Sequence, residues 1–176
     1  MTNLLTLYER VSRLPQGQRL FSTLFAVKAP YFRTIRPRFT ELRPNHVELT
    51  IRKRRGVHNH IGTVHVIAIC NGLEAAMGAL AEATIPPGKR WIPKGMEVSY
   101  TAKATSDITC VAETDPDQWT SGDPDLPVRV RATRDDGTVV VEGVIRLWVT
   151  DKPDDAAAGG HDGRRAAGPR PDPRPR

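Results

Sequence analysis

A twenty-residue apolar stretch, Val64 to Ala83, constrains the fold more than any other feature of the sequence. It reads VHVIAICNGLEAAMGALAEA, and Thr84-Ile85-Pro86-Pro87 ends it. Its length and its many alanines favour an α-helix over a strand. Because the stretch is apolar nearly all round, we expect the helix to be buried on most sides. Gly72, Gly78 and the alanines would let a sheet approach its backbone closely.

Strand patterns occupy most of the remaining chain. Residues 46–53 alternate apolar and polar side chains, which predicts a half-buried strand. Residues 35–42 are extended but contain Pro37, which favours an edge strand. After the helix only strand patterns follow, at 96–101, 108–113, 128–133 and 138–150, with Asp135-Asp136-Gly137 as a hairpin turn. Two strands, one buried helix and four strands in a meander predict an α+β fold.

The two ends of the chain differ from this centre. Residues 1–34 carry two helical patterns, which predict an N-terminal helical segment. Residues 153–176 contain no large apolar residue and are rich in Pro, Gly and Arg, so we expect a disordered tail. The sheet and its helix would form the domain between them, residues 35–152.

Composition limits the classes of function. There is no uninterrupted run of about 18 apolar residues and no signal-peptide pattern, so we expect a cytoplasmic protein without membrane association. Cys70 and Cys110 form no CxxC pattern and are expected to be reduced and buried. The net charge of +6 and the pI of about 9.7 suit nucleic acid, an anionic surface or a phosphate-bearing ligand. No nucleic-acid-binding motif accompanies them, so nucleic acid is an unlikely partner.

Residues that could take part in catalysis or binding cluster where the apolar helix should begin. Asn59, His60, Gly62 and His65 lie just before or at its start. The first turn of a helix exposes unpaired N–H groups and a partial positive charge. Such N–H groups can hold a carbonyl oxygen and the oxyanion that develops from it.

Glu74 is the unusual residue within the helix, and Asn71 shares its face three residues earlier. A carboxylate in an apolar setting is unfavourable unless it is paired or protonated. Glu74 could therefore be a structural acid bonded to a neighbouring strand or subunit, or a functional one. His58 and His60 fit loop positions, and because no carboxylate completes a ligand set with them, we predict no metal.

The segment Asn59-His60-Ile61-Gly62-Thr63-Val64-His65 resembles the motif N-x-x-G-[ST]-x-H-G-G of hotdog-fold thioesterases of the phenylacetate-pathway type. In that family an acidic residue follows the motif histidine by nine positions, and Glu74 stands there in this chain. Residues 96–104 resemble the strand that follows the family's helix. The resemblance covers residues 36–149 and is closest to an uncharacterised hotdog subgroup, a domain of unknown function.

The resemblance implies a hotdog fold: an antiparallel sheet wrapped around one long central helix, here with extra N-terminal helices. It implies an acyl-CoA thioesterase with no cofactor besides the coenzyme A of its substrate. Glu74 would be the general base or nucleophile, Asn59 would position water or substrate, and His65 would orient the helix start. A homodimer, or a dimer of dimers, would bring one chain's helix start to the other chain's acid.

The substrate-binding residues implied by the resemblance surround the helix start: Gly62, Val66, Ile67 and Asn71. The backbone N–H near Val66 would contribute to the oxyanion hole. In this chain Val66-Ile67 replaces the Gly-Gly of the family, and the added side chains would crowd an incoming thioester. Either the acyl pocket is reshaped or the chain binds acyl-CoA without turnover.

Basic residues leave further alternatives open. The run Arg52-Lys53-Arg54-Arg55, with Lys89, Arg90 and Lys94, could contact the phosphates of coenzyme A or could be a solvated surface. A second alternative function is binding of nucleic acid or an anionic surface through the basic loops and the Arg-rich tail.

Overall fold

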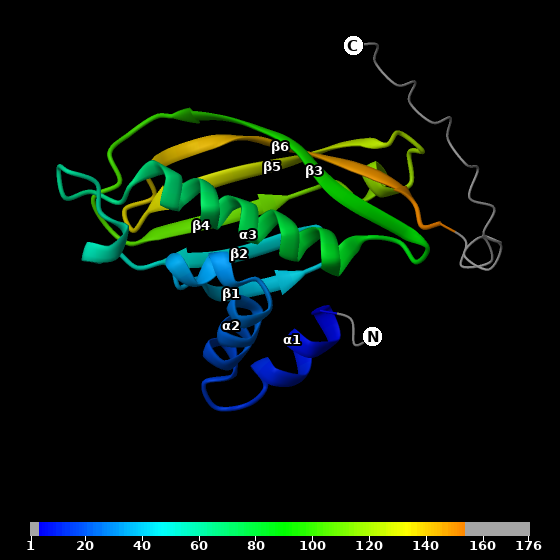
Figure 1. Ribbon diagram of the computed structural model, residues 1–176, viewed down its shortest axis with the longest axis horizontal. Helices are drawn as coiled ribbons and strands as arrows, with labels where there is room; N and C mark the ends of the chain where they lie inside the picture. Colours follow the sequence, from blue (N-terminus) through cyan, green and yellow to red (C-terminus); the bar gives the residue numbers. More distant parts are fainter. Residues whose placement is uncertain (1–3, 154–176) are drawn as a thin grey trace, which may run out of the picture.

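The computed structural model describes residues 4–153, which form one antiparallel sheet with a long helix lying across one face (Figure 1). The elements in chain order are α1 (Leu4–Ser12), α2 (Gly17–Lys28), η1 (Pro30–Thr34), β1 (Arg38–Arg43), β2 (His46–Ile51), η2 (Arg55–Val57), α3 (Val66–Thr84), β3 (Lys89–Tyr100), β4 (Ile108–Glu113), η3 (Pro116–Trp119), β5 (Asp125–Arg134) and β6 (Val139–Asp151). The η elements are short 3-10 helices. The expected α+β hotdog architecture, with N-terminal helices, is confirmed.

Helix α3 is the predicted apolar helix, and 11 of its 19 residues are buried. It begins two residues later than expected because Val64 is extended and forms a β-bridge with His58. By length and composition α3 could cross a membrane, but here most of it packs inside the protein. One stripe of the helix is not covered: Ile67, Glu74 and Glu82 are exposed.

A small residue lets α3 lie close to the sheet. A Cβ added to Gly72 would stand 2.5 Å from Cδ1 of Ile51 and 2.9 Å from Sγ of Cys110. Both of these neighbours are fully buried side chains of the sheet. The close approach expected from Gly72 is therefore observed, and it sets the depth at which the helix is buried.

The strands run in the order β1-β2-β4-β5-β6-β3, and every neighbouring pair is antiparallel. The predicted four-stranded meander is wrong for its first strand, β3, which does not pair with β4. Strands β4, β5 and β6 do form a meander, but β3 pairs with β6 at the far edge. The chain crosses from β3 to β4 through residues 101–107. Strand β1 is the opposite edge, as Pro37 indicated.

Strand β3 begins at Lys89, seven residues before the predicted start at Met96. Pro93 lies within it, which is compatible with an edge strand because a proline has no N–H to donate. No residue of β3 is fully buried. Its neighbour β6 approaches it at Gly143, where an added Cβ would overlap the carbonyl oxygen of Glu97. At this point the two strands meet backbone to backbone.

The N-terminal helices join the same hydrophobic core through aromatic side chains. Phe21 of α2 is fully buried and packs edge-on against Tyr8 and Phe39, with ring centroids 5.0 and 5.3 Å apart. Hydrogen bonds add to this contact: the hydroxyl of Ser22 accepts from the Phe39 N–H at 3.0 Å. The helical segment is therefore packed on β1, on the side of the sheet opposite to β3 (Figure 1). Apart from Pro153, the tail predicted for residues 153–176 lies outside the described residues.

We expect Phe21→Ala to lower the free energy of unfolding by about 3–5 kcal/mol, because it removes a fully buried ring and leaves a cavity. Urea denaturation followed by circular dichroism would measure it. Leu24→Ala, on the exposed side of the same helix, is the matched control and should change stability by less than about 0.5 kcal/mol. Equal effects of the two substitutions would contradict the packing of α2 on the sheet.

Candidate active site

The loop before α3 is organised by Asn59. Its side-chain oxygen accepts hydrogen bonds from the N–H groups of Ile61 and Thr63, both at 3.1 Å. Its amide nitrogen donates to the Thr63 hydroxyl at 2.8 Å. Gly62 completes this turn with a φ of 78°, which glycine adopts without strain. Asn59 and Gly62, both predicted site residues, therefore shape the loop that leads to the helix, and both lie close to its start.

His65 is the N-cap of α3. Its Nδ1 accepts a hydrogen bond from the Ile67 N–H at 3.1 Å, and its carbonyl oxygen accepts from Ala68 and Ile69. The Val66 N–H is left without an acceptor in the described part of the chain. A free amide at a helix start is a donor for an anion or a polarised carbonyl oxygen. His65 thus orients the helix start, and Val66 supplies the available donor.

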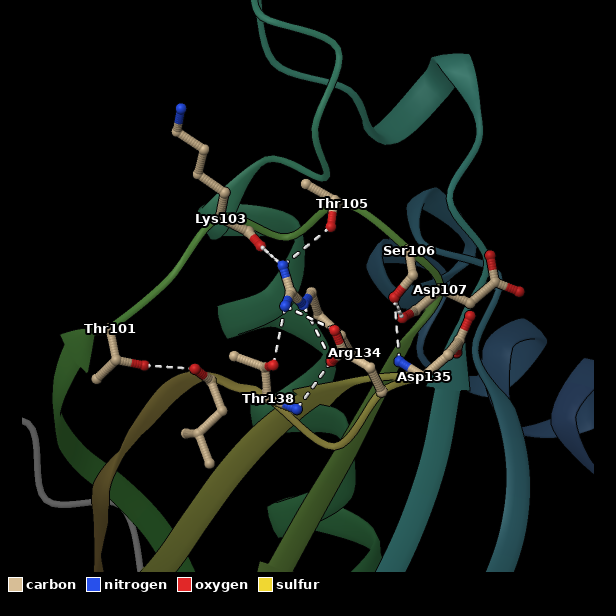
Figure 2. Close-up of polar contacts among 10 residues, drawn as sticks. Thr101, Lys103, Thr105, Ser106, Asp107, Arg134, Asp135 and Thr138 are labelled. Atoms are coloured by element: carbon tan, nitrogen blue, oxygen red, sulfur yellow. Dashed lines mark hydrogen bonds and ion pairs between the residues drawn. The ribbon is translucent and has the colours of Figure 1, made fainter.

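The β3–β4 crossover is hydrogen-bonded to the residues just before this helix start. The Val64 N–H donates to the carbonyl oxygen of Ala104 at 2.9 Å. Figure 2 shows how the crossover is fixed: the Arg134 guanidinium donates to the Lys103 carbonyl at 3.4 Å and to the Thr105 hydroxyl at 3.1 Å. Arg134 is itself only part-exposed, because its side chain is engaged in these contacts.

The opposite side of the crossover is held by Lys53. Its N–H donates to the Asp107 carboxylate at 2.8 Å, and its ammonium donates to the Thr105 carbonyl at 3.0 Å. Ser106 accepts from the Asp135 N–H at 3.1 Å, as Figure 2 also shows. These contacts join two segments far apart in sequence. These contacts are not predictable from the sequence, because each partner is a common loop residue.

Glu74 is exposed on α3, and its carboxylate has no hydrogen bond or ion pair within residues 4–153. Two contacts between α3 and β3 bracket it. The Trp91 indole donates to the Glu82 carboxylate at 3.0 Å, two turns further along the helix. One turn before Glu74, the Cys70 side chain interacts with the side chain of Tyr100 on β3. Glu74 therefore lies on the helix face that borders the edge strand.

Asn71 lies beside this face but is buried. Its amide nitrogen donates to the Thr34 hydroxyl at 3.2 Å, which ties α3 to η1. Its side-chain oxygen is buried without a hydrogen-bond partner in the described part of the protein. Asn71 therefore contacts the N-terminal segment, while Glu74, three residues later, faces solvent.

The free donor and the carboxylate of one chain are too far apart to act on one carbonyl group. Val66 and Glu74 are eight residues apart, which is about 12 Å along the axis of an α-helix. A glutamate side chain spans less than half of that distance. Hydrolysis needs the base and the oxyanion donor within about 3 Å of neighbouring atoms of one reacting group. A single chain therefore presents two separate halves of a site.

Ile67 projects from the helix start and is 55% exposed, so an approaching ligand would meet its side chain. Val66 beside it is half-buried and packs against the core. Of the two residues that replace the Gly-Gly of the resembled motif, only Ile67 has a side chain exposed to a ligand that approaches the helix start.

The basic run after β2 divides into two kinds of residue. Lys53 and Arg54 donate to backbone carbonyl oxygens, of Thr105 and Thr34 respectively, so they support the loops. Arg52 and Arg55 are exposed and have no partner in the part of the chain described here. Lys89, Arg90 and Lys94 each contact a neighbour on β6: Asp151, Thr150 and the Trp148 ring.

The two cysteines are reduced and neutral. Burial raises the pKa of the Cys70 thiol. The pKa of Cys110 is raised far above its usual value, mainly by burial and also by the nearby Cys70. Cys110 is buried as expected, whereas Cys70 is half-buried. Within the described residues no group of three or more His, Cys, Asp or Glu side chains is placed to hold a metal ion.

Comparison with known proteins places the chain in a family. Residues 17–149 match the family described as "Domain of unknown function (DUF4442)", and the chain belongs to it. The match includes α2, α3 and all six strands, the last of them as far as residue 149. No curated protein matches the sequence significantly.

Solved structures share the hotdog fold. A structural-genomics protein is 42% identical, with a TM-score of 0.76; the alignment covers 86% of this chain and 100% of that one. A probable thioesterase from Pseudomonas aeruginosa is 22% identical, with a TM-score of 0.67 over 79% of this chain and 97% of its own. A hypothetical thioesterase from Streptococcus pneumoniae, solved with coenzyme A, is 16% identical, with a TM-score of 0.55 over 67% and 91%.

The pKa of Asp136, in the turn between β5 and β6, tests the position of the Arg134 side chain shown in Figure 2. Hydrogen bonds from Thr138, backbone and side chain, and then from Arg134 lower the pKa of Asp136 to about 2. Because the pKa is lowered on folding, the contribution of the charged carboxylate is present above about pH 4 and is lost as the pH falls through about 2. Carbon NMR of the Asp136 carboxyl should show this midpoint. In Arg134→Gln the pKa should move up toward the usual value, and an unchanged midpoint would contradict the arrangement.

Proposed function

We propose that this protein is an acyl-CoA thioesterase in which Glu74 activates the attacking water. The observation that carries the proposal is the pairing, on one helix, of an unpartnered N–H at Val66 with an exposed, unpartnered carboxylate at Glu74. These are the oxyanion donor and the general base that thioester hydrolysis needs. The thioesterase names of the structural neighbours support the same reaction.

The site is shared by two copies of the chain, because one chain holds the two groups about 12 Å apart along the helix. Strand β3 supports this assembly. It is an edge strand of twelve residues, none fully buried, with Ile92 and Tyr100 more than half exposed. Pairing of two β3 edges about a two-fold axis would run the helices in opposite directions. The Val66 N–H of one chain would then approach the Glu74 of the other.

The proposed chemistry follows from these two groups. Glu74 takes a proton from a water molecule, and the water oxygen attacks the thioester carbonyl carbon. The Val66 N–H donates to the carbonyl oxygen as it becomes negative. When the carbon–oxygen double bond re-forms, the carbon–sulfur bond breaks and coenzyme A leaves as the thiol, with the proton returned by Glu74. Direct attack by the Glu74 carboxylate, through an anhydride, is the other route open to this geometry.

Coenzyme A is the proposed carrier of the acyl group. A neighbour with the same fold was solved with coenzyme A, and two cations here, Arg52 and Arg55, are exposed and unpaired near the loop that leads to α3. Arginine binds phosphate through charge-assisted hydrogen bonds. Ile67 at the helix start would select the acyl chain by its shape.

The first experiment is hydrolysis of short, medium, long and aromatic acyl-CoAs by the purified protein. We expect Glu74→Gln to lower kcat by about 10²–10⁴-fold, because it removes the general base and keeps the shape. Glu82→Gln removes a carboxylate from the same helix face two turns away and is the matched control, with activity near wild type. Equal activity of Glu74→Gln and wild type would sink the assigned mechanism.

A second experiment tests the shared site. Val66→Pro deletes the free N–H, and proline is well tolerated at the first position of a helix, after an extended residue such as His65. We expect it to lower kcat by about 10²-fold or more while Val66→Ala does not. Each variant alone should be nearly inactive.

Mixing Val66→Pro with Glu74→Gln and allowing subunits to exchange should restore activity, since half of the pairs formed at random would hold one intact site. The recovery should approach about one quarter of wild type, and light scattering should show a dimer. A mixture as inactive as its components, from variants that exchange freely, would mean that each chain acts alone.

A non-catalytic acyl-CoA-binding protein is the second candidate, and the exposed Ile67 side chain at the helix start favours it. Calorimetry with a non-hydrolysable acyl-CoA analogue separates the two. Binding without turnover of any acyl-CoA would support this candidate, and Ile67→Gly would then be the variant to assay for recovered hydrolysis.

A further inference from the structure

The surface of α2 carries an apolar stripe that nothing in the described chain covers. Leu20, Leu24 and Val27 follow helical spacing and are 47%, 43% and 60% exposed. Leu14 precedes them in the turn before α2, and Tyr31 follows in η1, at 54% and 68% exposure. These five residues make up half of the ten large exposed hydrophobic side chains of the described residues. We call them the α2 stripe.

The net positive charge of the protein lies in the part of the sequence that contains this stripe. Residues 1–40 contain seven Lys and Arg and one acidic residue, Glu9, so they carry the whole net charge of +6. Residues 41–176 contain equal numbers of basic and acidic residues, nineteen of each. The excess of basic residues therefore lies in the chain from the N-terminus to the start of β1, while the rest of the chain is balanced.

The cations of this segment are exposed on α2 and beside it. Arg19 and Lys28 flank the stripe on its two sides, as the helical turn of 100° per residue places them. Among the described residues of α1, α2 and η1, no ion pair neutralises any arginine or lysine. A hollow of about 440 Å³ at the start of α2 is lined by Leu14, Arg19 and Arg38, among others, so apolar and cationic groups meet in one depression.

We propose that the α2 stripe binds the surface of an anionic lipid bilayer. An exposed apolar helix face flanked by cations fits the interface, where leucines enter the acyl region and basic groups meet lipid phosphates. The cations beside the stripe attract an anionic bilayer. A second copy of the same surface is a poorer occupant, because it would bring Arg19 and Lys28 of both copies together. The sequence suggested an anionic surface only as an alternative, through the basic loops and the tail, and the α2 stripe is a different surface.

The position of the stripe leaves the candidate active site free. Helix α2 packs beyond β1, whereas β3 lies at the other edge of the sheet (Figure 1). A protein bound to lipid through α2 could still pair through β3. The inference rests on the exposed stripe and its charge, and it holds whether or not the protein hydrolyses thioesters.

The test is co-sedimentation of the full chain with vesicles of phosphatidylglycerol and phosphatidylcholine, compared with vesicles of phosphatidylcholine alone. We expect binding to the anionic vesicles, weakened by salt. Leu20→Ser with Leu24→Ser should reduce the affinity at least tenfold without lowering the unfolding temperature. Arg19→Ala with Lys28→Ala should reduce it by roughly fivefold for each charge.

A matched control removes the same charge elsewhere: Arg90→Ala with Arg131→Ala, both exposed on the sheet. These variants should bind as wild type does. Absence of wild-type binding, or equal loss in the control pair, would overturn the proposal. So would a serine variant that binds vesicles normally, or one that changes the oligomeric state in sedimentation, since the stripe would then be covered by another copy.

Discussion

The close contact between α3 and the sheet is the constraint on which the rest of the structure depends. At Gly72 the helix backbone lies against Ile51 and Cys110, and an added Cβ would force one of these side chains to shift. Buried alanines continue the contact toward the end of the helix. Because one side of α3 is held so deeply, its free side can only be the stripe that carries Glu74. Its first turn is fixed where the loops from Asn59 and the crossover meet.

The same packing explains why the candidate site is divided. A helix buried along its length places its first amide and its mid-helix carboxylate at a fixed separation, and no side-chain rotation closes it. In the proposed function, what one chain lacks comes from a second copy, at the edge where β3 is uncovered. The two proposals thus use different surfaces: the β3 edge beside α3, and the apolar α2 stripe with its flanking cations at the opposite edge of the sheet.

Local patterns predicted the elements whose structure is locally determined. The apolar helix, the alternating strand after Asn45 and the Asp135–Gly137 turn all follow from periodicity or turn chemistry. The place of β3 beside β6 was not predictable, because pairing between distant strands leaves little trace in either strand. The exposure of Glu74 was also missed: an apolar helix does not show in its sequence which narrow stripe stays uncovered. The contacts of Arg134 were not predictable either, since only the folded chain brings the crossover within its reach.

The backbone contact at Gly143 has a consequence for how such a protein can diverge. Where β6 meets β3 at this glycine, main-chain atoms rather than side chains set the spacing of the two strands, so the outward side chains of β3 take no part in it. Relatives could exchange the outward side chains of β3 freely and so acquire new binding preferences while the scaffold stays in place. Position 143, in contrast, should resist every replacement, which makes a single glycine a diagnostic mark for chains that keep this geometry.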